Sequence, residues 1–168
     1  MQGQLQDAGN TTTLSHYLEL LQKAGLLAGI GKFSQRTVKR RSSSPKLQVL
    51  NTGIMSALNG NTFNEIKQNP ERWGRWVESA IGAHLINITA DHSVNVFYWR
   101  DRNREVDFVL QRGNDLVVLE IKSGNRKTSL PGIELFEKKF PVKKSLLVGS
   151  TGMPLQELLQ MPIDGILN

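Results

Sequence analysis

Two apolar-rich stretches joined by a short polar turn stand out in the second half of the chain. Residues 105–110 begin with charged and apolar side chains in alternation, which is typical of a strand with one buried face. Residues 116–122 start as an apolar run and end in alternation, which predicts a second strand. Gly113-Asn114 between them tolerates positive φ and favours a two-residue hairpin loop. We therefore predict a hairpin in which Arg112 faces Asp115.

The same patterns predict the other elements. Helices are indicated by apolar residues at helical spacing and by capping signals, over residues 11–24, 52–58, 70–88, 130–140 and 154–160. Further strands are indicated by short apolar runs, starting at Leu26 and spanning 46–50, 94–100 and 144–148. From residue 70 onward the order is helix, three strands, helix, strand. A strand reached through a crossover helix runs parallel to its neighbour, so the last strand should lie parallel to residues 116–122.

The predicted hairpin brings charged side chains together. A two-residue loop places Asp107 directly opposite Glu120, and Lys122 shares a face with Glu120 because side chains alternate along a strand. Opposed like charges are unfavourable in a sheet, and a divalent cation between them would remove the penalty. Carboxylate oxygens suit Mg²⁺ or Mn²⁺, and the backbone carbonyl of Ile121 is a candidate third ligand.

This hairpin has a second interpretation. Many hairpins carry acidic and basic side chains on a solvated face, and the spacing alone is somewhat more typical of that arrangement. The register is also sensitive to the loop. A three-residue loop would turn Asp107 away from Glu120, unless a bulge restored the pairing.

The wider pattern resembles a known family. Asp107, twelve residues, and then Glu120-Ile121-Lys122 resemble the core of the PD-(D/E)xK nuclease superfamily, which has the restriction-endonuclease-like fold. Together with Tyr98-Trp99-Arg100, Glu105-Val106-Asp107-Phe108-Val109 and Ser123, the string is similar to the C-terminal domain of a group of prokaryotic predicted AAA+ ATPases. The resemblance extends from about Thr11 to the end of the chain.

The resemblance carries expectations about fold and site. It implies an α/β domain (α+β by some schemes) over residues 61–168, with an α-β-β-β-α-β core and a mixed sheet. It implies Asp107 and Glu120 as metal ligands, and Lys122 as a helper of the catalytic base or a stabiliser of charge. Glu78, on the preceding helix, would be an accessory acid. The alternative for Glu78 is an ordinary helix ion pair with Arg75. Glu78 also lies in a row with Gly74 and Gly82, and these small residues would let that ridge approach a neighbour closely.

Residues 1–60 resemble part of a winged helix. The helix over residues 11–24, Gly25 and the strand after it look like the last helix of such a domain and its wing. The alternative is a helix that packs on the following domain. We expect the chain to be a fragment of a longer protein whose ATPase module lies upstream. The family usually has Asp where this chain has Asn51, a departure outside the metal core.

Charge favours an anionic partner. The chain has 168 residues and a net charge of +6, and its sequence pI is near 9.8. Six basic residues and no acidic one lie in the expected wing: Lys32, Arg36, Lys39, Arg40, Arg41 and Lys46. Such a stripe can neutralise DNA phosphates. It is equally typical of a solvated loop, and it could also dock on another module.

Several classes of site are excluded by the sequence. The chain has no cysteine, and therefore no disulfide or cysteine-ligated zinc. No apolar run reaches a membrane span, and residues 1–10 do not resemble a signal peptide, so we expect a cytoplasmic protein. Gly31-Lys32 lacks the rest of a P-loop, so no ATP site is expected here. Two hypotheses remain: a Mg²⁺-dependent phosphodiesterase or binder of DNA, and a non-catalytic regulatory module attached to an ATPase.

Overall fold

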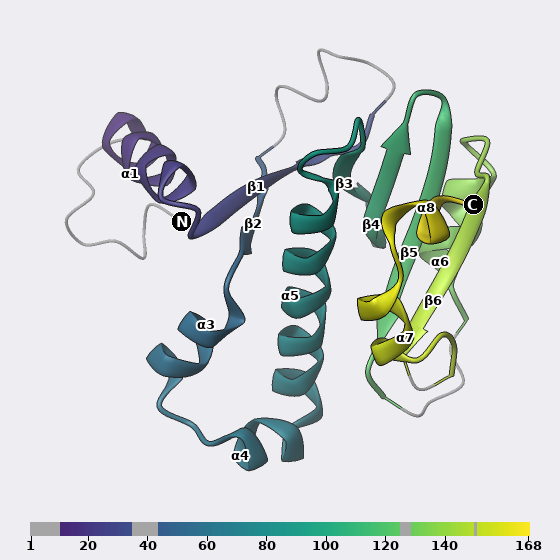
Figure 1. The fold of residues 1–168 in the computed structure, drawn as a ribbon. Coiled ribbons are helices and arrows are strands. Elements are labelled where there is room, and N and C mark those ends of the chain that lie inside the picture. The colour runs from purple at the N-terminus through teal and green to yellow at the C-terminus, as the bar shows by residue number, and fades with distance from the viewer. Residues whose placement is uncertain (1–10, 35–43, 125–128, 150) are drawn as a thin grey trace.

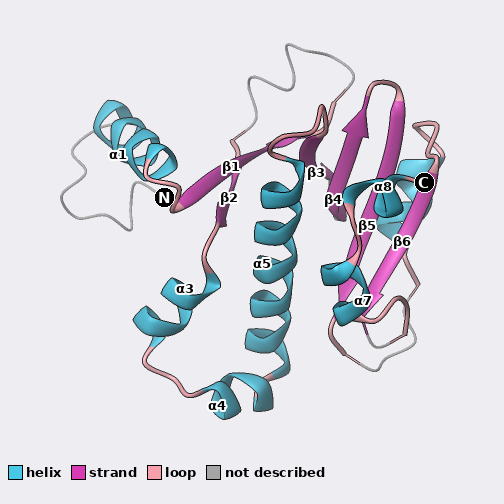
Figure 2. Ribbon diagram, in the orientation of Figure 1, coloured by secondary structure: helices cyan, strands magenta, loops and turns pink. Residues whose placement is uncertain are grey.

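A six-stranded mixed sheet forms the centre of the molecule, in the strand order β2-β1-β3-β4-β5-β6 (Figures 1 and 2). The structure is a computed structural model, and it describes residues 11–34, 44–124, 129–149 and 151–168. The strands are β1 (Leu27–Lys32), β2 (Lys46–Val49), β3 (Asn95–Asp101), β4 (Arg104–Arg112), β5 (Asp115–Lys122) and β6 (Lys144–Gly149). The helices are α1 (Thr11–Lys23), α3 (Thr52–Asn59), α4 (Phe63–Gln68), α5 (Pro70–Thr89), α6 (Pro131–Glu137), α7 (Leu155–Gln160) and α8 (Ile163–Leu167).

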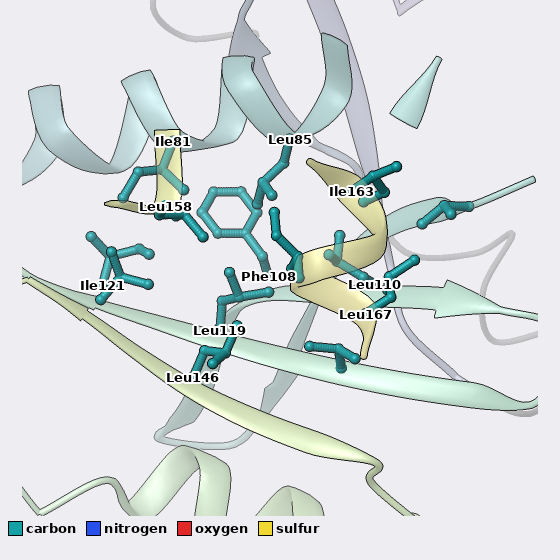
Figure 3. Packing of buried hydrophobic residues seen from close by; sticks show 14 of the residues in the cluster. Ile81, Leu85, Phe108, Leu110, Leu119, Ile121, Leu146, Leu158, Ile163 and Leu167 are labelled. Atoms are coloured by element: carbon teal, nitrogen blue, oxygen red, sulfur yellow. The ribbon is translucent and has the colours of Figure 1, made fainter. Parts of the chain in front are cut away.

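Helices cover both faces of the sheet and enclose two hydrophobic clusters. On one face, α5, α7 and α8 pack over β4, β5 and β6, where Ile81, Leu85 and Phe108 are completely buried (Figure 3). On the other face, α6 supplies Ile133 and Phe136 to a second cluster. Complete burial of one such side chain contributes about 1.5–3 kcal/mol, so these two layers hold the sheet between them.

Local signals explain why α5 forms where it does. The Asn69 side chain accepts a hydrogen bond from the Arg72 N–H at 3.1 Å, and Pro70 occupies the first helical position. This confirms the predicted start. Two short helices were not predicted. The capping box of Thr62 and Glu65 opens α4, and this Thr-x-x-Glu pattern was available in the sequence. Helix α8 has five residues after Pro162, too few for a clear apolar period.

The hairpin of β4 and β5 has the predicted register. Arg112 faces Asp115, and Gly113 has a φ of 60°, which suits the first position of a two-residue loop. The sequence did not reveal an irregularity on the other side of β4. Phe97 pairs with Val109 and Trp99 with Val106, so two residues of β4 lie opposite one residue of β3. This bulge comprises residues 107 and 108, so it increases the local strand twist at Asp107.

The last strand also lies as predicted. β6 pairs with β5 in parallel, so that Lys122 lies beside Gly149. At the other side of the sheet, β1 pairs in parallel with β3 and antiparallel with β2. The N-terminal segment therefore extends the same sheet. Helix α1 lies apart from the other helices, next to β1 (Figure 1). Within the described residues, no helix has the length and apolar character needed to cross a membrane.

The glycines on either side of Glu78 do bring α5 close to its neighbours, as predicted. A Cβ at Gly82 would lie 2.1 Å from Oε1 of Gln48 and 3.0 Å from Cζ of Phe108. Gln48 is almost fully buried, and its side-chain amide donates to the carbonyl of Ser79 at 2.8 Å. A Cβ at Gly74 would meet only Oγ of Ser123, at 3.3 Å. Gly82 thus sets how closely α5 approaches β2.

We predict opposite effects for alanine at these two glycines. Both changes gain about 1 kcal/mol of helix propensity. Gly82→Ala should still destabilise the protein by about 1–2 kcal/mol net, because it displaces the buried Gln48. Gly74→Ala should be neutral or slightly stabilising, and it is the matched control. Urea unfolding of both variants measures the difference, and equal stability changes would contradict the packing described here.

Candidate functional site

Five charged side chains from four elements lie close enough to interact electrostatically. Helix α5 provides Glu78, β4 provides Asp107, β5 provides Glu120 and Lys122, and β2 provides Lys46. We call these five residues the acid cluster. In the hairpin Phe108 pairs with Leu119, and Asp107 and Glu120 are the next residues along the two strands. The four residues singled out in α5, β4 and β5 by the sequence are therefore brought together, and Lys46 joins them.

Asp107 carries the strongest electrostatic signature of the cluster. Its Oδ2 accepts a hydrogen bond from the N–H of Ile121 at 2.8 Å, which fixes the carboxyl against β5. Burial, followed by the charges of Glu120 and Glu78, raises the pKa of Asp107 from 3.8 to about 7. The Ile121 hydrogen bond and Lys46 oppose this rise but do not cancel it. Without a further cation, Asp107 is therefore about half protonated at neutral pH.

Glu120 and Lys122 form a close ion pair on β5. Lys122 Nζ lies 2.6 Å from Oε1 of Glu120, so the two side chains share a face as predicted. The residue Glu120 is only 9% exposed, and its Oε2 is buried without a hydrogen-bond partner. An unpartnered carboxylate oxygen in such a place is costly. Glu120 therefore has one oxygen free to accept a cation or a proton.

The charge of Lys122 is stabilised by its neighbours. Burial alone lowers the pKa of this ammonium group. The hydrogen bond and charge of Glu120, with the charges of Asp107 and Glu78, outweigh burial and raise the pKa above 10.5. Lys122 is consequently a cation at neutral pH, suited to stabilise negative charge rather than to accept a proton.

Glu78 pairs with Lys46, a contact that the sequence did not predict. Lys46 Nζ contacts Oε1 of Glu78, lies 4.0 Å from Oε1 of Glu105 and sits 5.7 Å from the ring centroid of Phe108. The alternative pairing of Glu78 with Arg75 is wrong, because Arg75 pairs with Glu71 one turn earlier. Lys46 reaches the cluster because β2 packs on α5. No local spacing in the sequence predicts this contact.

Lys32 is the other basic residue of the predicted wing that lies within the described ranges. Arg36, Lys39, Arg40 and Arg41 lie outside the described residues. Lys32 is half-buried at the end of β1, where it pairs in register with Tyr98. The Tyr98 hydroxyl donates to the carbonyl of Ser44 at 3.0 Å, just before β2 begins.

The carboxylate oxygens of the cluster suit a hard divalent cation, but two of the carboxylates are already paired with lysines. Asp107 and Glu120 offer carboxylate oxygens, and Oε2 of Glu120 has no other partner. Within the ranges that the structure describes, no three acidic, histidine or cysteine side chains converge as ligands of one metal ion. In the same cluster, Lys46 pairs with Glu78 and Lys122 pairs with Glu120.

We predict that Asp107→Asn stabilises the metal-free protein in a pH-dependent way. Between pH 4 and 7 the folded protein binds more protons at Asp107 than the unfolded chain does, so its free energy of unfolding falls as pH rises through this window. Asparagine can keep the Ile121 hydrogen bond and cannot ionise.

At pH 8 in EDTA, Asp107→Asn should raise the free energy of unfolding by about 1–3 kcal/mol, less than full linkage because Asp107 keeps some solvent contact. The gain should shrink toward zero at pH 4.5. The exposed Asp91→Asn is the control for lost charge. Urea unfolding at both pH values measures the effect, and a gain independent of pH would contradict it.

Comparisons with known proteins give a family but no activity. A family model described as a domain of unknown function (DUF8612) matches residues 3–65. No curated protein matches the chain. The crystal structure of protein VC1899 from Vibrio cholerae aligns at 15% identity with a TM-score of 0.31, and the match covers 84% of this chain and 34% of that one. At that TM-score the likeness carries no argument. A model described as a domain of unknown function (DUF4143) matches residues 73–163, more than half of the chain, and the chain therefore belongs to this family.

Proposed function

We propose that the acid cluster is the site of a divalent-cation-dependent phosphodiesterase that acts on DNA. The observation that carries this proposal is the hairpin of β4 and β5, which brings Asp107 within electrostatic range of Glu120, beside a charged Lys122. In this hairpin, Oε2 of Glu120 is buried without a hydrogen-bond partner. Packing alone gives no reason to assemble buried like charges. A hard divalent cation bound between these carboxylates would offset their mutual repulsion.

The order of elements supports a restriction-endonuclease-like fold. The chain runs α5, β3, β4, β5, α6, β6, and β6 lies parallel to β5. This fits the α-β-β-β-α-β core of the PD-(D/E)xK superfamily, with Asp107 on one strand and Glu120-Ile121-Lys122 on the next. In the same proposal α1, β1 and β2 are the remnant of a winged helix, and the domain is the C-terminal part of a larger AAA+-type ATPase.

The charge balance of the cluster fits Mg²⁺ or Mn²⁺. Four carboxylates lie within it or against it, those of Glu78, Glu105, Asp107 and Glu120. Two ammonium groups, Lys46 and Lys122, offset half of this charge when all four acids are ionised. The remaining two negative charges equal the charge of one divalent cation. Asp107, Glu120 and the carbonyl of Ile121 would hold it, with Glu78 as the accessory acid.

The chain's own groups then have defined roles. A bound divalent cation supplies stabilisation of the charge that develops on a phosphoryl group. Lys122, kept protonated by Glu120, contacts the phosphate oxygens and stabilises the same charge. Three exposed arginines lie in or beside the β3–β4 turn, next to Glu105: Arg100, Arg102 and Arg104. Together with the net charge of +6, they favour a polyanion as substrate.

A second candidate function is a non-catalytic regulatory module of the same ATPase. It is favoured by the two lysine ion pairs and by the lack of three convergent metal ligands among the described residues. In this case Lys46 and Lys122 neutralise the carboxylates permanently, and the site is a structural centre.

We predict that the wild-type chain binds Mn²⁺, with Mg²⁺ weaker, and that the double variant Asp107→Ala, Glu120→Ala does not. The reason is that these carboxylates supply the cation's negative ligands. The control is Asp91→Ala with Glu157→Ala, which removes the same charge from exposed positions. Isothermal titration calorimetry measures binding, and circular dichroism checks the fold.

Three outcomes separate the candidates. Binding that is lost only in the site variant, together with DNA cleavage that Lys122→Met abolishes, supports the phosphodiesterase. Binding without cleavage of single-stranded, duplex or branched DNA favours the regulatory module. No binding by wild type at millimolar Mn²⁺ would exclude a cation-dependent site in this chain.

A further inference from the structure

Lys46 reaches the acid cluster from a different part of the chain than the acids do. It lies in β2, within the segment matched by the DUF8612 model, whereas Glu78, Asp107 and Glu120 lie in the segment matched by DUF4143. The glutamate-x-lysine pattern does not include Lys46. The N-terminal hairpin of β1 and β2 therefore supplies a cation to a cluster built by the rest of the domain.

The position of Lys46 is fixed by its surroundings. Its Nζ contacts Glu78 and lies 4.0 Å from Glu105, while its side chain is 29% exposed. Two residues along β2, the buried side-chain amide of Gln48 donates to the carbonyl of Ser79, the residue after Glu78. The missing Cβ of Gly82 makes room for this contact. The ammonium group is thus anchored against α5 rather than left as a free surface charge.

An ammonium ion and a divalent cation compete for the same carboxylates. While Lys46 pairs with Oε1 of Glu78, the ammonium group competes with a metal for that oxygen, and its positive charge repels an incoming cation. Glu120 is also paired, through Oε1 with Lys122, but its buried Oε2 has no hydrogen-bond partner.

We propose that Lys46 is a built-in counter-cation that holds Glu78 until a divalent cation displaces it. This inference rests on the proposed cation site and assigns Lys46 as the positioning residue that sets cation affinity. Removing its charge should tighten binding, since Glu78 becomes a free ligand and the repulsion ends.

A purely structural ion pair predicts the reverse. If Lys46 only ties β2 to α5, its loss should lower stability and leave cation affinity unchanged, or weaken it through a disordered Glu78. Affinity and stability therefore separate the two roles, and neither depends on catalysis.

The experiment compares Mn²⁺ binding by calorimetry for wild type, Lys46→Met and Lys46→Arg. Lys46→Met should bind Mn²⁺ roughly threefold to thirtyfold more tightly, whereas Lys46→Arg, which keeps the charge, should stay near wild type. Lys23→Met on α1 removes the same charge from a distant exposed position and should change nothing. Thermal unfolding of each variant reports the stability change.

A measurement on the wild-type chain covers the case in which Lys46→Met does not fold. Nitrogen-15 spectra of the lysine ammonium groups should show the Lys46 signal without metal, and saturating Mg²⁺ should shift or broaden it as the ion pair opens. An unchanged Lys46 signal in saturating Mg²⁺ would overturn the inference.

The outcomes also distinguish this inference from the proposed function. Unchanged or weaker Mn²⁺ binding by folded Lys46→Met, with wild type still binding, overturns the role of Lys46 and leaves the cation site intact. Absence of binding in every variant overturns both. Binding by wild type that becomes tighter in Lys46→Met but not in Lys46→Arg supports the counter-cation role.

Discussion

Two carboxylates held opposite each other across a largely buried hairpin are the constraint on which the rest of the site depends. Burial, and then the negative charges of Glu120 and Glu78, raise the pKa of Asp107 to about 7. The sheet forces this approach, because the strands that carry the two acids also form the buried centre of the fold. The protein must therefore offset the repulsion with a proton, with lysines or with a bound cation.

The structure shows the lysine solution directly, and the raised pKa of Asp107 favours the proton as a second one. Lys122 and Lys46 each take one carboxylate, and a partly protonated Asp107 absorbs more of the excess charge. Neither the lysines nor the proton provides a hydrogen-bond partner for the buried Oε2 of Glu120. A divalent cation would bind that oxygen and neutralise the charge of Asp107 at the same time. The two lysines offset only part of this negative charge, which is why we infer a site for a hard cation here.

The sequence predicted the local parts of this arrangement. Gly113-Asn114 predicts the hairpin loop and the pairing of Arg112 with Asp115, and Asn69-Pro70 predicts the start of α5. These succeed because turn and capping preferences act over a few residues. The parallel placement of β6 followed from the crossover rule.

What the sequence could not predict depends on contacts between distant segments. The bulge in β4 follows from how β3 and β4 pair, and the position of Lys46 follows from how β2 packs on α5. Lys46 was assigned to a basic stripe for DNA, since a run of basic residues is all that its neighbours show. The parallel pairing of β1 with β3 likewise joins residues more than sixty positions apart.

Anomalous diffraction from crystals grown with Mn²⁺ tests the central claim most directly, because it locates the cation without relying on activity or affinity. The account predicts a single strong peak between the carboxylates of Asp107 and Glu120, with Lys46 moved away from Glu78. A hairpin with both lysine ion pairs intact and no peak between these carboxylates would contradict it.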